Sequence, residues 1–191
     1  MMKILKLLYK VVLVVGFVGA VSGQNSISIA DVLPKLQTSI LRNSASQELI
    51  LLGFQRQVVS KSKEEFFQGF IDSHSVLVSV RKTSKNGLVI GYCIIFQDTK
   101  ETWWKKKESL DRLVLLLSKY YERDPLNSVR FLPADCKGNE ALCFKDGIAK
   151  YQTSWCWNDA VQRIKSVNLG VDNQYRSVLE ITDNHFESKA D

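Results

Sequence analysis

The sequence predicts a mixed α+β domain stabilised by disulfide bonds, and three observations support this. Ile29 to Leu41 places apolar side chains at three- and four-residue spacing, which is typical of an amphipathic helix. Two β-branched apolar segments, Ser75 to Arg81 and Leu88 to Phe96, flank Lys85-Asn86-Gly87, and an Asn-Gly pair between such segments predicts a β-hairpin. The chain also has four cysteines, an even number that favours disulfides in an exported protein.

The first 23 residues have the pattern of a signal peptide. Three lysines and no acid precede the apolar run Val11 to Val21, which ends at the small residues Ser22 and Gly23. We expect cleavage after Gly23 or Ala20, and therefore a protein that is secreted or held in the lumen of the secretory pathway. The alternative is an uncleaved single-pass anchor from Ile4 to Val21, but two lysines would then lie inside a span that needs about 20 apolar residues.

Removal of this leader changes the charge argument. The leader contains three lysines and no acids, so the formal net charge falls from +6 to +3. A charge of +3 on a domain of this size gives no reason to expect nucleic-acid binding, and a membrane contact is expected only if the leader is kept as an anchor.

We divide the chain into the signal peptide (1–23), an N-terminal helical segment (24–47), an α+β domain (48–186) and a loose C-terminal tail (187–191).

The favoured disulfide pairing joins Cys136 to Cys143 within a short loop and Cys93 to Cys156 across the domain. The local bridge is suggested by the loop-like residues around Gly138. A metal site and a cofactor are not expected, because the chain has no Cys-x-x-Cys pair and only two histidines. Both histidines, His74 and His185, are interpreted as surface residues.

Further elements are predicted from the apolar pattern. Glu48 to Phe54 reads as a strand, and Lys61 to Ile71 reads as a helix with an aromatic face. Leu110 to Tyr121 fits either a helix or a buried strand, because periodicity does not separate the two in a continuous apolar run. Additional strands are expected at Ser128–Leu132, Ile148–Tyr151, Trp155–Trp157 and Ser177–Thr182.

One stretch is a candidate contact patch. Paired tryptophans stand beside three lysines, a combination that can bind a membrane surface, a nucleic acid or an acidic partner. The alternative, which we favour, is a loop with one tryptophan in the core and solvated lysines. The residues of this patch are Trp103, Trp104, Lys105, Lys106 and Lys107.

No catalytic residue is predicted. Nucleophilic catalysis needs an activated Ser, Cys or Thr beside a base, and the chain has no Gly-x-Ser-x-Gly motif. Glycine patterns that bind phosphates are absent as well. The sequence therefore favours a binding protein over an enzyme.

An ordered set of four segments carries a resemblance to a known family. These segments are Leu51-Leu52-Gly53-Phe54-Gln55-Arg56, Ser62 to Phe70, Val80 to Gly87, and Val89-Ile90-Gly91-Tyr92. Their order resembles that of a TLDc domain, the module of the oxidation-resistance proteins. Leu113 to Leu117 is similar to an apolar strand of that family, which favours a strand there.

The resemblance implies an antiparallel two-sheet β-sandwich with flanking helices, and a protective or regulatory role through binding. The resulting hypothesis is a secreted, non-catalytic binding domain that acts on an unidentified protein partner, in stress or defence. Two alternatives remain: a lineage-restricted secreted enzyme or effector with an unrecognised site, and a membrane-anchored accessory subunit of a larger complex.

Overall fold

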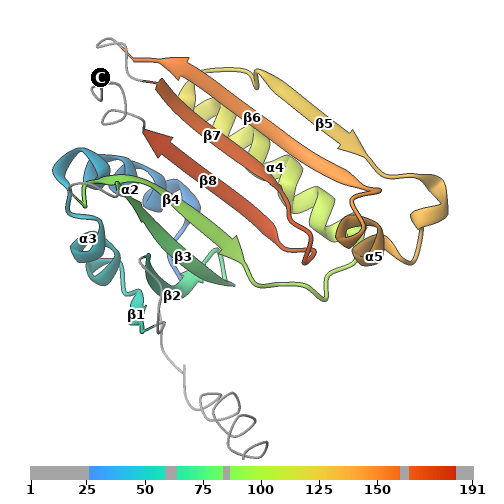
Figure 1. The fold of residues 1–191 in the computed structure, drawn as a ribbon, viewed down its shortest axis with the longest axis horizontal. Helices are drawn as coiled ribbons and strands as arrows, with labels where there is room; N and C mark the ends of the chain where they lie inside the picture. The colour runs from blue at the N-terminus through green and yellow to red at the C-terminus, as the bar shows by residue number, and fades with distance from the viewer. Residues whose placement is uncertain (1–25, 59–63, 84–86, 160–163, 184–191) are drawn as a thin grey trace, which may run out of the picture.

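The computed structural model describes residues 26–58, 64–83, 87–159 and 164–183 (Figure 1). Within these residues the fold is α+β, as expected, with four α-helices and one antiparallel sheet of eight strands. The strand order is β1-β2-β3-β4-β8-β7-β6-β5. The expected two-sheet sandwich is therefore wrong for the described strands, because all eight share one continuous hydrogen-bonded ladder.

The sheet consists of two halves, each with one long helix and four strands. The first half runs through α2 (Ile29–Arg42), α3 (Ala45–Leu51), β1 (Gln55–Gln57), β2 (Glu65–Ile71), β3 (His74–Lys82) and β4 (Val89–Phe96). The second half runs through α4 (Trp103–Tyr121), β5 (Asn127–Phe131), the 3-10 turn η1 (Ala134–Cys136), α5 (Glu140–Lys145), β6 (Lys150–Asn158), β7 (Ile164–Val171) and β8 (Ser177–Asp183). Each half thus has a long helix followed by four strands that pair in chain order, and the two halves differ in the place of the short helix, which precedes β1 as α3 and lies between β5 and β6 as α5. The halves join where β4 pairs with β8, for example at Tyr92 and Ile181.

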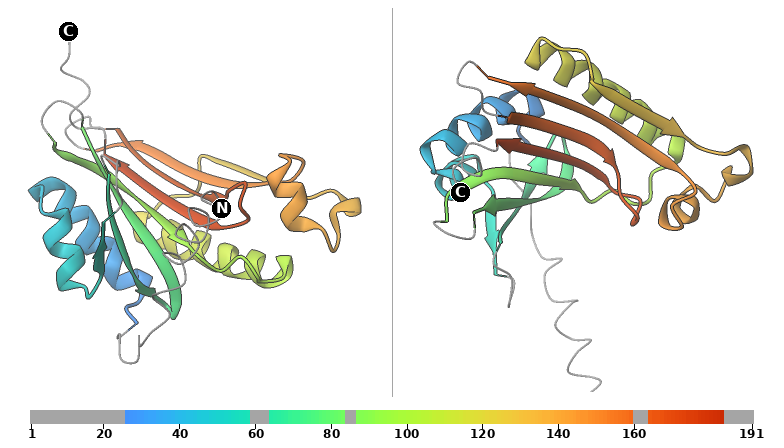
Figure 2. Two further views of the ribbon diagram at one scale, coloured as in Figure 1. Left: turned by 60° about the horizontal axis from the view of Figure 1, so that its bottom comes forward. Right: turned by 45° about the horizontal axis from the view of Figure 1, so that its top comes forward.

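Helices α2 and α4 lie on the same face of the sheet (Figure 2). The Gln37 side chain of α2 donates to the Tyr121 hydroxyl at 3.0 Å and accepts from the Tyr120 hydroxyl at 3.2 Å, which links the two helices directly. Alternate residues of the strands point at the helices, as the two-residue period of a strand requires. The core between the layers includes Val32, Leu33, Leu36, Val78, Ile94, Leu110, Leu117, Tyr151, Trp155, Leu169 and Leu179.

Helix α2 confirms the predicted amphipathic segment. Ser28 is its N-cap and accepts a hydrogen bond from the Ala30 N–H, and Asn43 ends it in the left-handed conformation. Pro34 occupies the sixth helical position.

Three short apolar segments were assigned to the wrong element. Of the predicted strand Glu48–Phe54, residues 48–51 lie in helix α3 (45–51), and of the predicted helix Lys61–Ile71, residues 65–71 form strand β2. In β2 the aromatic run alternates, so that Phe67 and Ile71 are buried while Phe66 faces the other side. Leu113 to Leu117 lies within α4, so the strand implied by the resemblance is wrong as well.

The predicted hairpin is present as β3 and β4. The two strands pair antiparallel from Val76 opposite Phe96 to Val80 opposite Tyr92, and Gly87 has the positive φ of 66° expected near the turn. Lys85 and Asn86 lie outside the described residues. Gly91 permits a close backbone contact between β4 and β8, since a Cβ atom there would lie 2.2 Å from the Ile181 carbonyl oxygen.

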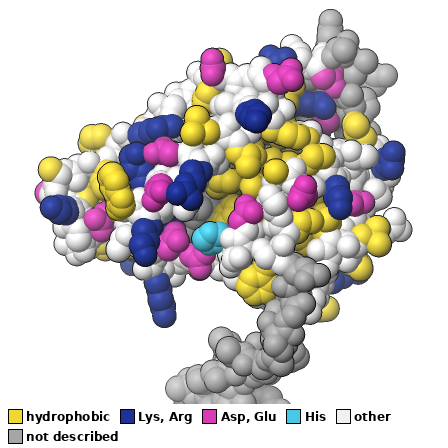
Figure 3. Space-filling model, turned by 180° about the vertical axis from the view of Figure 1, so that it is seen from behind, with side chains coloured by type: hydrophobic (Ala, Val, Ile, Leu, Met, Phe, Trp, Pro, Cys, Tyr) yellow, Lys and Arg dark blue, Asp and Glu magenta, His cyan; other side chains and the backbone are white. Residues whose placement is uncertain are grey.

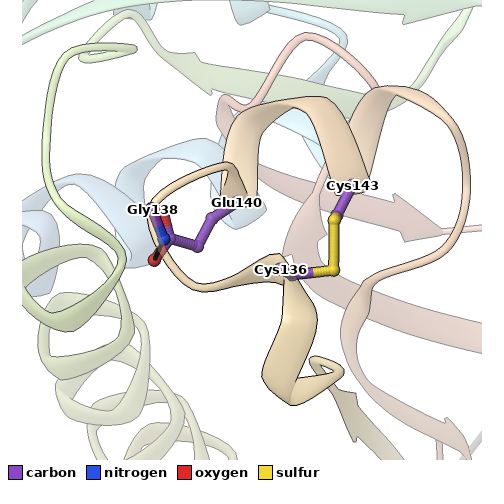
Figure 4. Close-up of a disulfide and its surroundings, with 4 residues drawn as sticks. All are labelled: Cys136, Gly138, Glu140 and Cys143. Atoms are coloured by element: carbon purple, nitrogen blue, oxygen red, sulfur yellow. Dashed lines mark hydrogen bonds between the residues drawn. A yellow bond between two sulfur atoms is a disulfide. The ribbon is translucent and has the colours of Figure 1, made fainter.

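Cys136 and Cys143 form a disulfide with a Cα–Cα distance of 6.0 Å (Figure 4). Glu140 accepts a hydrogen bond from the Gly138 N–H at 3.0 Å inside the same loop. The expected Cys93–Cys156 bridge is wrong, because both are free thiols on β4 and β6. Those strands are three interstrand steps apart, about 14 Å, whereas a disulfide needs Cα atoms within about 7 Å.

No helix in the described part of the chain is long and apolar enough to cross a membrane. The predicted signal peptide (1–23) and the C-terminal tail (187–191) lie outside the described residues. Helix α2, assigned to the N-terminal segment 24–47, shares one hydrophobic core with the strands of segment 48–186.

Candidate functional site

A cleft of about 300 Å³ lies where the two halves meet. Its residues come from the start of α2, the turn between β2 and β3, the first residues of β3 and β8, the end of β4, the loop between β4 and α4, and one side of α4. Figure 3 shows this face, where the histidine lies among acidic side chains below a broad apolar surface. The lining residues are Ile29, Asp72, His74, Phe96, Asp98, Glu101, Lys106, Ser109, Leu110, Arg112, Leu113, Leu116 and Ser177.

A tight turn between β2 and β3 positions His74. Its two central residues, Asp72 and Ser73, have φ values of 47° and 68°, the left-handed pair that a two-residue hairpin turn requires. The Asp72 carboxylate accepts the Ile29 N–H at the start of α2 at 3.3 Å. The turn is thereby tied to the helix, and His74 follows it as the first residue of β3.

His74 is paired with Asp98, which follows the end of β4. Its Nδ1–H donates to Asp98 Oδ2 at 2.5 Å, and its ring packs edge-on against Phe96 with centroids 6.2 Å apart. The side chains of His74 and Asp98 are 36% and 41% exposed. Both polar groups are therefore ordered by contacts and still accessible from the cleft.

Lys106 forms the buried floor beside this pair. Its side chain is 1% exposed, and its ammonium donates to the Asp98 carbonyl oxygen at 2.8 Å. The ammonium lies 3.7 Å from a Glu101 carboxylate oxygen and 4.9 Å from the centre of the Tyr175 ring. Burial lowers the pKa of Lys106, and the charges of Glu101 and Asp98 offset only part of that effect. Lys106 thus anchors the loop after β4 to helix α4.

The opposite wall of the cleft is apolar. Leu110 is fully buried, while Leu113 and Leu116 are partly buried on the same side of α4. Ile29 and Phe96 complete this wall from the first half. A hollow with apolar walls and a few convergent polar groups is the usual form of a small-molecule site.

Three side chains at the polar end could hold a metal ion. His74, Asp98 and Glu101 each offer one ligand atom, and these atoms lie within 4.8 Å of one another. An imidazole nitrogen with two carboxylate oxygens is a donor set that divalent transition metals accept.

The structure does not bring the candidate contact patch together on one surface. These residues open helix α4, so their side chains point in different directions. Trp103 packs on Phe144 with ring centroids 5.1 Å apart, and Lys106 is buried. Lys107 pairs with an acid one turn later, while Trp104 is 75% exposed. Lys105 is exposed as well.

The sequence reasoning missed the polar end of the cleft. His74 was interpreted as an isolated surface residue, and Asp98 and Glu101 were not singled out. The predicted hairpin contained a usable signal, because the pairing of Val76 with Phe96 continues outward to His74 and Asp98. In a hairpin, the start of the first strand lies beside the end of the second. His74 and Asp98 therefore become neighbours although they are 24 positions apart in the chain.

No protein-family model matches the chain, and no curated protein and no solved structure match it either. The fold and the cleft therefore define only a class, an α+β domain with a single antiparallel sheet. The resemblance to TLDc domains stays a prediction. Two of the elements that it implied differ here, since residues 65–70 form a strand and residues 113–117 lie in a helix.

Proposed function

We propose that this chain is a non-catalytic binding domain of the secretory pathway that takes a small amphipathic molecule in the cleft between its two halves. The apolar body of the ligand packs against Phe96, Leu113 and Leu116, and its polar end bonds to His74 and Asp98. One observation carries the proposal: a cleft of about 300 Å³ combines an apolar wall with a cluster of ionisable groups at one end. That volume is at the lower end of the range for small-molecule sites.

A binding role is supported over a catalytic one by the surroundings of His74. Within the described residues, no hydrogen bond joins His74 to a serine, threonine or cysteine side chain, so no nucleophile–base pair is assembled. Lys106 is enclosed by its carbonyl and carboxylate partners, and 1% exposure leaves no room for a substrate to reach its nitrogen.

The location in the secretory pathway rests on two features. The leader pattern of residues 1–23 predicts export. The Cys136–Cys143 disulfide supports an oxidising compartment, where such bonds persist.

The binding proposal is tested with a neutral apolar dye. Nile red fluoresces when it leaves water, so its titration measures occupancy of the apolar wall. Leu113→Trp places a large ring in the cleft and is expected to weaken dye binding by about tenfold or more, a loss of about 1.4 kcal/mol. Circular dichroism confirms that the variant is folded.

Leu115→Trp is the matched control. Leu115 lies two residues further along α4, is 71% exposed and does not line the cleft. The same ring is added there without filling the cleft, so dye affinity is expected to stay unchanged. Equal affinity of the two variants would contradict the proposed site.

A second function is favoured by the exposure of Trp104. This side chain lies beside a shallow apolar hollow that Leu132, Pro133 and Ala134 also line. Exposed tryptophans are common anchors in protein interfaces. A photo-crosslinker at position 104 is then expected to capture a lumenal protein partner, whereas the same group at the equally exposed position 115 is not. Equal capture from both positions would remove the support for this function.

A further inference from the structure

We propose that His74, Asp98 and Glu101 bind one divalent transition-metal ion, of the zinc class, at the polar end of the cleft. This site does not depend on the proposed organic ligand, because all three donors belong to the chain. The metal alone is therefore a sufficient test.

The geometry of the three donors fits a zinc-sized ion. Tetrahedral coordination with bonds of about 2.0–2.2 Å puts neighbouring donor atoms about 3.3 Å apart. Here His74 Nδ1 and Asp98 Oδ2 are 2.5 Å apart, and all three donors lie within 4.8 Å. When Nδ1 binds the ion, the imidazole proton moves from Nδ1 to Nε2, so the ring stays neutral. Side-chain rotations that move each donor atom by about 1 Å lengthen the 2.5 Å distance between His74 and Asp98 and shorten the longest distance among the three donors, so that all approach the tetrahedral value. The partial exposure of these side chains permits such rotations.

The backbone around the donors is held in place. The turn at Asp72 and Ser73 fixes the start of β3, and the Lys106 ammonium holds the Asp98 carbonyl group. Only the donor side chains need to move, and an ordered backbone lowers the entropic cost of binding.

The charge balance favours a cation. The carboxylates of Asp98 and Glu101 carry two negative charges, and the adjacent Lys106 ammonium compensates one of them. Asp72 adds another carboxylate to the lining of the same cleft, whereas the charge of Arg112, which lines it as well, is compensated by Glu108. The end of the cleft thus keeps a net negative charge that a bound divalent ion neutralises.

The donor types select the class of metal. Calcium takes six to eight oxygen ligands and magnesium keeps oxygen and water, so neither uses an imidazole nitrogen. Zinc accepts histidine and carboxylate together, and three protein ligands leave a fourth position for water or for a ligand group. We therefore expect Zn²⁺ to bind, Mn²⁺ to bind more weakly, and Ca²⁺ not to compete.

The experiment is a calorimetric titration of the purified, tag-free full chain with zinc chloride. One ion per chain is expected, with a dissociation constant in the micromolar range or tighter. His74→Gln and Glu101→Gln are each expected to weaken binding at least tenfold. Two separate variants are used so that a folding defect in one does not decide the result, and circular dichroism checks both.

Three controls separate this site from other zinc ligands of the chain. His185→Gln removes the other histidine, and Cys156→Ser removes the exposed free thiol. Glu108→Gln removes a carboxylate of α4 that pairs with Arg112 outside the cluster. All three are expected to bind zinc as the wild type does. Cobalt(II) substitution should give visible d–d bands in the wild type and lose them in His74→Gln.

Absence of saturable zinc binding by the wild type would overturn the proposal. So would binding that persists in folded His74→Gln and Glu101→Gln, or binding that disappears in Cys156→Ser or His185→Gln.

Discussion

The two halves of the sheet share one layout but differ in how their aromatic side chains are arranged. Both cores mix aliphatic and aromatic residues, and in the first half α2 packs with aliphatic side chains, among them Leu33, Leu36 and Val78. In the second half the rings form a connected cluster, in which Trp103 contacts both Phe144 and Tyr151, with centroids 5.1 and 6.0 Å apart. The layout therefore does not depend on one arrangement of rings, provided that alternate strand positions are apolar.

Each half also has one carboxylate that accepts hydrogen bonds from side chains of more than one element. Glu65 of β2 accepts hydrogen bonds from Ser46 of α3 and Lys82 of β3. In the second half, Asp111 of α4 accepts from Lys107 and from the Tyr151 hydroxyl of β6. In both cases the carboxylate ties a helix to the edge side of the sheet.

The halves differ most in what they give to the cleft. The first half supplies the paired His74 and the ring of Phe96, whereas the second supplies the apolar side of α4 and the buried Lys106. Neither half alone forms the complete cleft, since Asp98 and Glu101 lie in the loop that connects the halves and α4 completes the apolar wall. The site thus arises at the boundary of the halves, which agrees with the tendency of ligand sites to lie between structural units.

The largest expected effect comes from truncating one core leucine in each half. Leu36→Ala in α2 and Leu117→Ala in α4 each remove a fully buried side chain and should cost about 2–5 kcal/mol. All four tryptophans lie in the second half, so their fluorescence follows that half alone. Because β4 pairs with β8 in one sheet, Leu36→Ala is expected to lower the fluorescence and circular dichroism midpoints equally. A shift of the dichroism midpoint alone would mean that the halves unfold separately.

Removal of the disulfide should have a smaller effect, confined to stability. The Cys136→Ser and Cys143→Ser double variant loses a bridge with a sequence separation of 7, worth about 2 kcal/mol. Neither cysteine lines the cleft, so dye binding should be unchanged under folding conditions. Urea denaturation and the dye titration together check this. A loss of dye binding in the folded double variant would contradict the assignment of the cleft boundaries.

The carboxylates of Glu65 and Asp111 should each contribute less than about 1 kcal/mol of pH-dependent stability. Burial raises the pKa of Asp111, but the Lys107 and Tyr151 hydrogen bonds and the charges of Lys107 and Arg130 outweigh it and lower the pKa. Burial likewise raises the pKa of Glu65, while Ser46, Lys82 and Arg56 lower it further than burial raises it. A lowered folded-state pKa stabilises the protein above the unfolded pKa of about 4, and this is lost as the pH falls through the folded-state value.

Asp111→Asn and Glu65→Gln should therefore both lose less stability than the wild type between about pH 5 and pH 2. Urea denaturation at a series of pH values measures this difference. Parallel acid profiles for wild type and both variants would contradict the proposed role of these carboxylates.

The smallest expected effect is that of Ser73→Gly, one of two residues with positive φ that can be compared. Ser73 (φ 68°) is exposed, so Ser73→Gly should relieve backbone strain and raise stability by about 1 kcal/mol or less. Tyr175 (φ 61°) is buried, and its ring contacts Phe144 and the Lys106 ammonium. Tyr175→Gly should therefore destabilise the protein in spite of the same relief. Thermal melts of both variants distinguish backbone strain from side-chain packing.

The sequence predicted those elements whose signals are local. Helix α2 and the β3–β4 hairpin were found because a 3.6-residue period and an Asn-Gly turn are short-range patterns. Residues 65–71 and 113–117 were misassigned, because a short apolar run fits both a helix and a strand until tertiary packing decides. The repeated layout was not predicted, since many different apolar side chains satisfy the same alternation. The polar end of the cleft depends on strand register. The predicted β3–β4 hairpin could have placed His74 beside Asp98, but no local pattern places Glu101 or α4 next to them.

Native mass spectrometry of the protein isolated from a secreting cell tests most directly the claim that the boundary between the halves is a binding site. The account predicts that the wild type and Leu115→Trp carry a small molecule that denaturation releases and Nile red displaces, and that Leu113→Trp carries none. The claim would be contradicted by an adduct that persists in Leu113→Trp. It would equally be contradicted by a wild-type protein that carries no adduct and takes up no Nile red.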